Sequence, residues 1–265
     1  MSVHPSAVVS PTARIGGAVG IGPLAVVEDD TTIGDGCEVR AHAVIKRFTT
    51  LGAHNRVHEG AVLGGEPQDL AFGGQDTALV IGDRNVIREG VTIHRSTKPG
   101  GATVVGSDCF LMAYVHVAHD NRIGDRAILA NNVMLAGHVE VGASTFIGGG
   151  AGIHQFCRIG ESAMVAGLAR ITRDVAPFLM VAERDEVPGF NLVGLKRRGL
   201  SRETIREIKD CYAHVFRSGD PRPLAAARLA AGVNSPEARR FLEFFAGGKR
   251  GFARPARGDE STSES

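Results

Sequence analysis

An aliphatic residue recurs at every sixth position along most of this chain. Steps of six from Val9 to Ile171 visit 28 positions, and 25 of them are Ile, Leu or Val. These three residue types make up about a fifth of the chain, so an unpatterned sequence would give roughly six such matches. Glycine often follows the aliphatic residue, as in Ile123-Gly124. A sustained period of six predicts hexapeptide repeats.

Strand geometry turns this period into a fold. Six residues at ~3.3 Å each give one flat side of about 20 Å with its corner, and three sides close a triangular coil. Successive coils then stack at the ~4.8 Å spacing of paired strands, with the aliphatic residues pointing inward. The pattern therefore predicts a mainly β protein built on a parallel β-helix.

Three of the visited positions are not aliphatic: Asp69, Gln75 and Pro99. They lie in two segments, 64–78 and 95–103, which we predict to be loop excursions from the coil. Both preserve the phase of six, so the solenoid resumes in register after each. Loops of this kind commonly carry function, although simple tolerated insertions are the alternative.

The repeat decays after Ile171 and divides the chain into three predicted parts. Residues 1–190 form the β-helix domain, residues 191–248 an α-helical C-terminal domain, and residues 249–265 a disordered tail. Ser201, Asp220-Pro221 and Ser235-Pro236 predict three helix starts, because Ser and Asp cap helix N-termini and Pro suits the first turn. The tail is too polar and too rich in Gly, Ser and Arg to pack.

Composition narrows the function classes. The 30 basic and 29 acidic residues give a net charge of +1, which disfavours a nucleic-acid partner. The four cysteines are scattered without a C-x-x-C pair, so we predict buried thiols in a reducing compartment. We also expect no membrane span, because no run approaches ~20 apolar residues, and a cytoplasmic location, because the N-terminus lacks the features of a secretory signal.

The stretch YVHVAHDNRIG, residues 114–124, places two histidines and an aspartate inside the repeat. Val117 takes an inward position, so His119 faces outward. Neighbours in successive coils are eighteen residues apart, which predicts one column of His119, Gly137 and Gln155. The same offset places Asp120 under His138. We expect His116 and His154 on or near the same face.

This arrangement permits several interpretations. Histidine, with an ordinary pKa of ~6.5, can act as a general base, especially beside a carboxylate. A glycine in the next coil brings a backbone N–H close to an anion formed beside that base, a combination typical of acyl transfer. The alternatives are a solvated polar strip and a zinc site with three imidazoles, as in the gamma-class carbonic anhydrases.

Six segments of the chain resemble the UDP-N-acetylglucosamine O-acyltransferase family, over residues 1 to about 250. They are GEPQDL (65–70), IGDRNVIREGVTIHR (81–95), VGSDCFLMAYVHVAHD (105–120), ILANNVMLAGHVEVG (128–142), IHQFCRIG (153–160) and NLVGLKRRG (191–199). The resemblance implies a left-handed coil, a homotrimer with sites between subunits, and the first step of lipid A biosynthesis. The implied reaction transfers a 3-hydroxyacyl chain from acyl carrier protein to the 3-hydroxyl of UDP-N-acetylglucosamine. No cofactor or metal is implied beyond the 4′-phosphopantetheine that the carrier protein brings.

The resemblance also implies a role for each site residue. His119 would be the general base, Asp120 its support and Gly137 the oxyanion donor. Substrate contacts would come from Gln68, Asp69, His116, His138, His154 and Gln155, with Asn191, Arg197 and Arg198 binding the phosphopantetheine arm or phosphates. Gly167 matches the family position that limits acyl length, and its missing side chain would leave room for a longer chain. A basic face at Lys196, Arg197, Arg198, Arg202 and Arg206 would meet the acidic carrier protein.

Two departures from the family pattern concern the acceptor. Ala71-Phe72 stands where the family usually has Lys-Tyr, and Val193 stands where it usually has an acidic residue. An acceptor with a 3-amino group therefore stays open. The rival enzyme is the later N-acyltransferase of the same pathway, which usually carries an extra N-terminal uridine-binding domain. A scaffold or carrier-binding module without catalysis is the non-enzymatic alternative.

Overall fold

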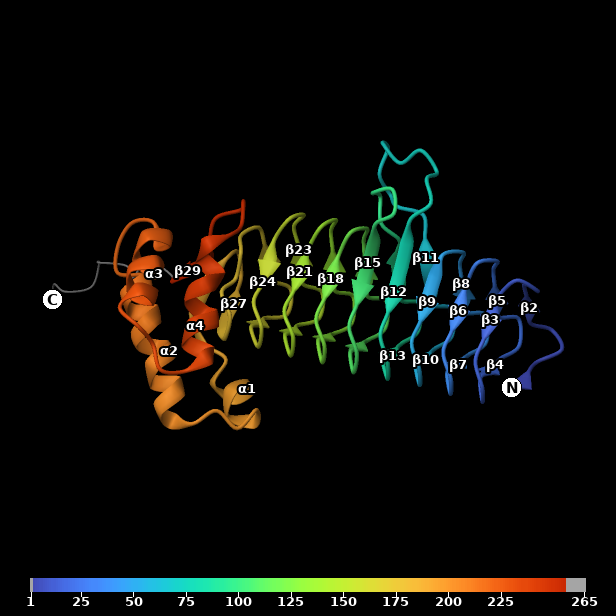
Figure 1. The fold of residues 1–265 in the computed structure, drawn as a ribbon, viewed down its shortest axis with the longest axis horizontal. Coiled ribbons are helices and arrows are strands. Elements are labelled where there is room, and N and C mark those ends of the chain that lie inside the picture. The colour runs from blue at the N-terminus through green and yellow to red at the C-terminus, as the bar shows by residue number, and fades with distance from the viewer. Residues whose placement is uncertain (1, 256–265) are drawn as a thin grey trace, which may run out of the picture.

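The computed structural model describes residues 2–255, which form a long solenoid of stacked coils followed by a helical bundle (Figure 1). Each coil contributes one short strand to each of three sheets, and strands of successive coils pair in parallel. Two loops project from one edge of the solenoid, between β11 and β12 and between β14 and β15 (Figure 1).

Sheet A runs the whole length of the solenoid and continues beyond it. Its strands are β1 (Ser2–Val3), β4 (Gly20–Ile21), β7 (Glu38–Val39), β10 (Arg56–Val57), β13 (Val86–Ile87), β16 (Phe110–Leu111), β19 (Ile128–Leu129), β22 (Phe146–Ile147), β25 (Met164–Val165), β27 (Leu179–Ala182), β28 (Glu186–Phe190) and β29 (Arg254–Pro255). The pair β27 and β28 is antiparallel, so a hairpin ends the coil.

Sheets B and C form the other two sides of the prism. Sheet B contains β2 (Val8–Val9), β5 (Val26–Val27), β8 (Val44–Ile45), β11 (Val62–Gly65), β14 (Thr92–His94), β17 (His116–Val117), β20 (Met134–Leu135), β23 (Gly152–Ile153) and β26 (Arg170–Ile171). Sheet C contains β3 (Arg14–Ile15), β6 (Thr32–Ile33), β9 (Thr49–Leu51), β12 (Ala78–Ile81), β15 (Ala102–Val105), β18 (Arg122–Ile123), β21 (Glu140–Val141) and β24 (Arg158–Ile159).

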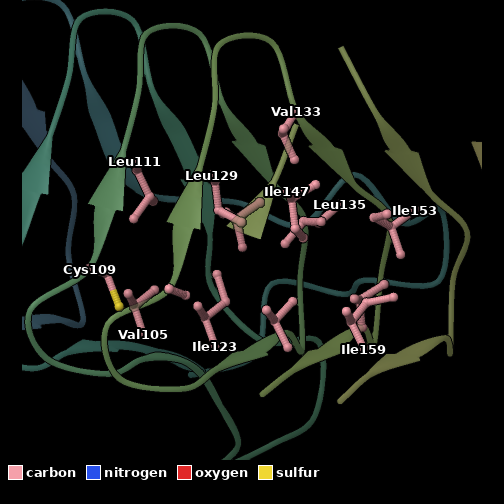
Figure 2. Packing of buried hydrophobic residues seen from close by; sticks show 14 of the residues in the cluster. Val105, Cys109, Leu111, Ile123, Leu129, Val133, Leu135, Ile147, Ile153 and Ile159 are labelled. Atoms are coloured by element: carbon pink, nitrogen blue, oxygen red, sulfur yellow. The ribbon is translucent and has the colours of Figure 1, made fainter. Parts of the chain in front are cut away.

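The register of these sheets confirms the predicted coil length. Val117 pairs with Leu135, eighteen residues on. Across the two loops, Leu51 pairs with Ile81 and Ile81 with Val105, offsets of 30 and 24 residues that are still multiples of six. The aliphatic positions of the repeat therefore stay inward throughout, and they fill the prism with closely packed Val, Ile and Leu side chains (Figure 2).

Four cysteines lie in this protein, and all four are buried and free, as predicted. Cys109 lies in the core of the prism beside Val105 (Figure 2). Burial raises the pKa of Cys109 to about 11, so this thiol stays protonated and behaves as a small apolar side chain.

The C-terminal region begins where the sequence predicts helix. Its elements are α1 (Leu192–Arg197), α2 (Arg202–Val215), α3 (Pro221–Ala230), α4 (Pro236–Glu243) and the 3₁₀ turn η1 (Phe244–Ala246). Ser201, Asp220 and Ser235 each accept a hydrogen bond from a first-turn N–H, which confirms the three predicted caps. Aromatic side chains join the bundle, with Phe241 and Phe245 fully buried.

Residues 249–255 differ from the predicted disordered tail. Phe252 and Ala253 are buried, and β29 pairs in parallel with β28. The physical reason is a backbone match with Asp174, whose N–H donates to Gly251 O and whose carbonyl accepts from Ala253 N. A sequence rich in Gly and Arg therefore packs because a partner strand already exists. The rest of the predicted tail, 256–265, lies outside the described residues.

Candidate active site

His119 and Asp120 lie at the corner between β17 and β18. His119 is half-buried beside the strand end, and Asp120 takes a left-handed backbone conformation with φ of 61°. The next two coils repeat this conformation at His138 and Phe156, with φ of 60° and 66°. Asp and His tolerate this region better than most residues with a Cβ, so the corner sequence suits its geometry.

Gly137 stacks directly on His119, as the eighteen-residue offset predicts. A Cβ atom built at Gly137 would lie 2.7 Å from His119 Nε2 and 2.5 Å from Cε1. Glycine is therefore the residue that lets the backbone approach the imidazole this closely. Within residues 2–255, the Gly137 N–H has no hydrogen-bond acceptor, so it is free to bind an anion formed beside His119.

Asp120 supports His119 from behind. His119 Nδ1–H donates to Asp120 Oδ2 at 2.8 Å, which leaves Nε2 free to accept a proton. Asp120 also accepts from the Ser96 and Thr97 hydroxyls at 2.5 and 2.6 Å. Burial would raise the pKa of Asp120, but these hydrogen bonds outweigh it and hold the pKa well below its usual value. The carboxylate therefore stays charged.

Burial lowers the pKa values of two neighbouring histidines, His116 and His138. Burial lowers the pKa of His116, whose Nδ1 hydrogen-bonds to Thr92 Oγ1 at 2.7 Å. Burial also lowers the pKa of His138, whose Nε2 lies 3.7 Å from Asp120 Oδ2 and whose ring stacks on Phe156 at 4.6 Å. Both imidazoles are thus biased toward the neutral form at physiological pH.

A groove of about 650 Å³ opens in front of His119 and gathers six of the thirteen predicted residues, His119 included. Gly137 forms part of its wall, and so do Gln68, His116, His154 and Gln155. Gln68 comes from the first loop, which also carries the exposed Asp69, and Asp69 is close enough to act on the charge of His138. Hence the first loop contributes a side chain to the wall of the groove.

Four predicted residues lie elsewhere in the chain. Gly167 stacks over Gly149 at the corner between sheets A and B, the opposite end of sheet B from His119. The remaining three, Asn191, Arg197 and Arg198, belong to α1 and its two caps, at the edge of the solenoid opposite the loops (Figure 1).

The α1 residues also make local contacts within the chain. Asn191 is buried, caps α1 and donates to Ser162 O. Arg198 contacts Ser162 Oγ and lies 3.9 Å from Glu161. One chain therefore does not bring these residues to His119, and Asn191 has a structural role that its motif did not reveal.

Sequence reasoning missed other residues of the site. Ser96 and Thr97 hold Asp120 from the second loop, and Met134, Arg170 and Thr172 line the groove. Met134 and Arg170 occupy the same outward column as His116, so the coil register could have found them. No such rule locates Ser96 and Thr97, because the loop that carries them lies outside the repeat.

Known proteins share both halves of this architecture. The model of the bacterial transferase hexapeptide family matches residues 12–47 and 102–137, and the model described as UDP-N-acetylglucosamine O-acyltransferase, domain 2, matches residues 174–253. A relative from Janthinobacterium sp. (strain Marseille) is 49% identical, over 95% of this chain and 99% of its own length. A relative from Anaeromyxobacter sp. (strain K) is 46% identical, over 96% and 100%. Both are named acyl-(acyl-carrier-protein)–UDP-N-acetylglucosamine O-acyltransferase.

Solved structures agree with the sequence relatives. The UDP-N-acetylglucosamine O-acyltransferase from Moraxella catarrhalis superimposes with a TM-score of 0.92 at 38% identity, and the UDP-N-acetylglucosamine acyltransferase from Campylobacter jejuni with 0.90 at 35%. Each alignment covers 96% of this chain and 100% of the other. The predicted fold class, a left-handed parallel β-helix followed by a small helical region, is thereby confirmed. The chain belongs to the UDP-N-acetylglucosamine O-acyltransferase family.

Proposed function

We propose that this protein transfers a 3-hydroxyacyl chain from acyl carrier protein to the 3-hydroxyl of UDP-N-acetylglucosamine, the first step of lipid A biosynthesis. The observation that carries the proposal is the placement of His119 Nε2 against the Gly137 backbone, with a charged Asp120 behind the ring. Membership of the family supplies the substrates, since the relatives are named for this reaction.

The chemistry follows from these groups. His119 Nε2 removes the proton of the sugar hydroxyl, and the oxygen attacks the thioester carbonyl carbon. The carbonyl oxygen becomes an anion that accepts from the Gly137 N–H. When this intermediate collapses, the C–S bond breaks and the imidazolium returns its proton to the departing thiolate. Asp120 balances the positive charge of the imidazolium during the reaction. No metal or protein-bound cofactor takes part.

The groove residues divide between the two substrates. Gln68 and Asp69 project from the first loop and hold the glucosamine ring, while His116, His138, His154 and Gln155 contact the acyl donor or the nucleotide. Ala71 is exposed beside them, and Phe72 stands 5.3 Å from the Arg95 guanidinium. The missing lysine and tyrosine at these positions make a 3-amino sugar a second acceptor to test.

The remaining predicted contacts point to a homotrimer. Gly167 lies at another corner of the prism than His119, and Arg197 and Arg198 lie on and beside α1, at the edge opposite the loops (Figure 1). A neighbouring copy therefore supplies them if they serve one site. The basic residues around α1 and α2 would receive the acidic carrier protein. Within residues 2–255, no helix has both the length and the apolar character needed to cross a bilayer. We propose a cytoplasmic location.

Purified protein with 3-hydroxyacyl carrier protein tests the reaction directly. The acceptors to compare are UDP-N-acetylglucosamine, its 3-amino analogue and UDP-3-O-acylglucosamine. H119A should lose at least ~100-fold in kcat while keeping the mass and thermal midpoint of the wild type. Full activity of H119A would remove the assigned base. Metal analysis separates the zinc alternative, because His119, Asp120 and His138 offer three ligand atoms within 4.8 Å of one another.

A further inference from the structure

The second loop surrounds Asp120 with hydroxyl groups. Ser96 Oγ donates to Asp120 Oδ1 at 2.5 Å, and Thr97 Oγ1 donates to Oδ2 at 2.6 Å. The Thr97 backbone N–H adds a longer bond to Oδ2 at 3.2 Å. At the far end of the loop, Thr103 Oγ1 accepts from the Asp120 N–H at 2.8 Å. Residues at both ends of the loop therefore hydrogen-bond to Asp120.

Burial and backbone hydrogen bonds hold these contacts in place. Ser96 is fully buried, and the Asp120 side chain is only 5% exposed. The Ser96 hydroxyl oxygen also accepts from Lys98 N–H at 3.1 Å, which folds the loop back on itself. Thr103 belongs to β15, which pairs with β12 and β18. The hydroxyls are thus held by the loop and by sheet C independently of His119.

The hydrogen bonds of Asp120 also decide which ring nitrogen of His119 carries the proton. Asp120 Oδ2 accepts from Thr97 and from His119 Nδ1–H at once, and Oδ1 is taken by Ser96. With Oδ1 bonded to Ser96 and Oδ2 shared by Thr97 and His119, a single rotamer of the Asp120 side chain serves all three donors. His119 then keeps its proton on Nδ1 and presents Nε2 to Gly137.

We propose that Ser96 and Thr97 are positioning residues for the reaction, which fix the orientation of Asp120 and through it the tautomer and direction of His119. This inference rests on the proposed function, because the direction of His119 matters for a proton transfer at Nε2. It assigns a task to the second loop, which contributes to the site by holding the Asp120–His119 pair.

The proposal also predicts a change in the pH profile. Without the two hydroxyls, Asp120 loses donors to its charged form while its burial remains, so its pKa rises. Proton uptake by the hydrogen-bonded Asp120–His119 pair then begins at a higher pH, so the acidic limb of activity moves up. The other charged or titratable groups facing Asp120 are His119 on its own corner and, in the adjoining groove, Lys98, Arg122, His138, Glu140, Arg158 and Lys249. These are unchanged in the variants.

The test compares S96A/T97V with T97V, T97S and wild type. We expect S96A/T97V to lose at least ~10-fold in kcat with KM within about twofold, and the acidic limb of kcat/KM to move to higher pH. T97S keeps the hydroxyl and should restore most of the activity lost in T97V. S107A is the matched control, because the Ser107 hydroxyl accepts from Asp83 N–H at a distant corner. A wild-type kcat and pH profile in S96A/T97V would overturn the proposal, as would T97S being as impaired as T97V.

A second readout needs no substrate. Nitrogen-15 NMR of the histidine side chains, with the His119 signals assigned by H119Q, reports which ring nitrogen carries the proton. We expect an Nδ1–H tautomer in wild type and a mixture in S96A/T97V. An unchanged tautomer in that variant contradicts the positioning role. Inactivity of the wild type toward all offered acceptors would instead contradict the proposed function, so the two failures are distinguishable.

Discussion

The space between the His119 imidazole and the Gly137 backbone is too small for one more carbon atom. A Cβ at Gly137 would lie 2.5 Å from His119 Cε1, well inside van der Waals contact. G137A must therefore displace the ring or the coil, and displacements near 1 Å cost about 100-fold in rate. We predict a fall of at least ~100-fold in kcat/KM, measured by steady-state kinetics with acyl carrier protein thioester.

Gly20 provides the matched control for this substitution. Among the residues that the structure describes, a Cβ there meets no atom within 4 Å, so G20A makes the same chemical change without a clash. G20A should retain wild-type activity. If G137A is also fully active, the ring and the glycine are not stacked in solution as the structure shows them.

His94 makes the stability of the protein depend on pH. Burial lowers the pKa of His94 to about 4, with the neighbouring His116 and His119 adding to the effect. In the unfolded chain a histidine titrates near ~6.5, so acidification below that value protonates the unfolded state first. The contribution of His94 to the free energy of unfolding is therefore complete above pH ~6.5 and is lost as the pH falls toward 4.

At pH 5 this loss should reach about 2 kcal/mol in wild type. H94Q cannot titrate, so its free energy of unfolding should fall less between pH 7.5 and pH 5. Denaturant unfolding at one fixed protein concentration measures the difference, because oligomer stability depends on concentration. An equal acid loss in H94Q and wild type would show that His94 is not the group responsible.

Residue-scale prediction succeeds wherever the repeat fixes the register. His119, Gly137 and Gln155 share one column because Val117 pairs with Leu135 and each coil adds eighteen residues. It fails for Ser96 and Thr97, since a loop outside the repeat has no period to place its side chains. The structural role of Asn191 was likewise hidden, because a motif records a residue type and not its hydrogen bonds.

At the scale of elements, the first loop depends on a buried arginine. Arg95 is 3% exposed, lies 5.3 Å from the Phe72 ring and donates to Glu66 at 3.3 Å. These contacts tie the base of the second loop to the first, which carries Gln68 into the groove. The two excursions therefore form one structural unit, which the sequence showed only as two separate breaks in the repeat.

R95M should loosen this unit while preserving much of its apolar packing. Because Gln68 and Asp69 hold the sugar in our proposal, we predict that KM for UDP-N-acetylglucosamine rises about 10-fold with kcat within about threefold. R126A is the control, since Arg126 is exposed and bonds only to Ser144 through its side chain within the described residues. A loss confined to kcat would argue against a role in sugar binding.

Element boundaries were predictable where a local rule applies. The capping residues Ser201, Asp220 and Ser235 located three helices, because their side chains satisfy first-turn N–H groups in any context. The hairpin of β27 and β28 and the short β29 obey no such rule. β29 forms only because β28 offers it an edge, which is a property of the assembled fold.

At the scale of the whole molecule, a buried ion pair joins the helical bundle to the solenoid. Asp174 is fully buried and accepts from Arg158 Nε at 2.9 Å, while Arg158 also donates to Phe244 O at 3.0 Å. A buried pair of this kind fixes geometry more than it adds stability. The bundle is therefore held in one orientation on the last coils, with α1 at the edge opposite the loops (Figure 1).

This fixed orientation makes the proposed homotrimer testable by complementation. Arg197 is exposed in α1, at a different corner from His119, so one chain cannot bring both to a single groove. If the neighbouring copy supplies Arg197, a site is complete when two different chains contribute intact residues. R197A and H119A should each be impaired at least ~10-fold alone, because each removes one contact from every site.

Co-expression of the two variants should then restore activity. With equal amounts and random mixing, about a quarter of the sites pair an intact His119 with an intact Arg197 from the neighbour. We predict activity near one quarter of wild type from the mixed oligomer, together with a solution mass of three chains by light scattering. Mixing the separately purified proteins without subunit exchange should restore nothing. If co-expression also leaves activity at the level of the single variants while the oligomer is mixed, both residues act from one chain and the shared site is wrong.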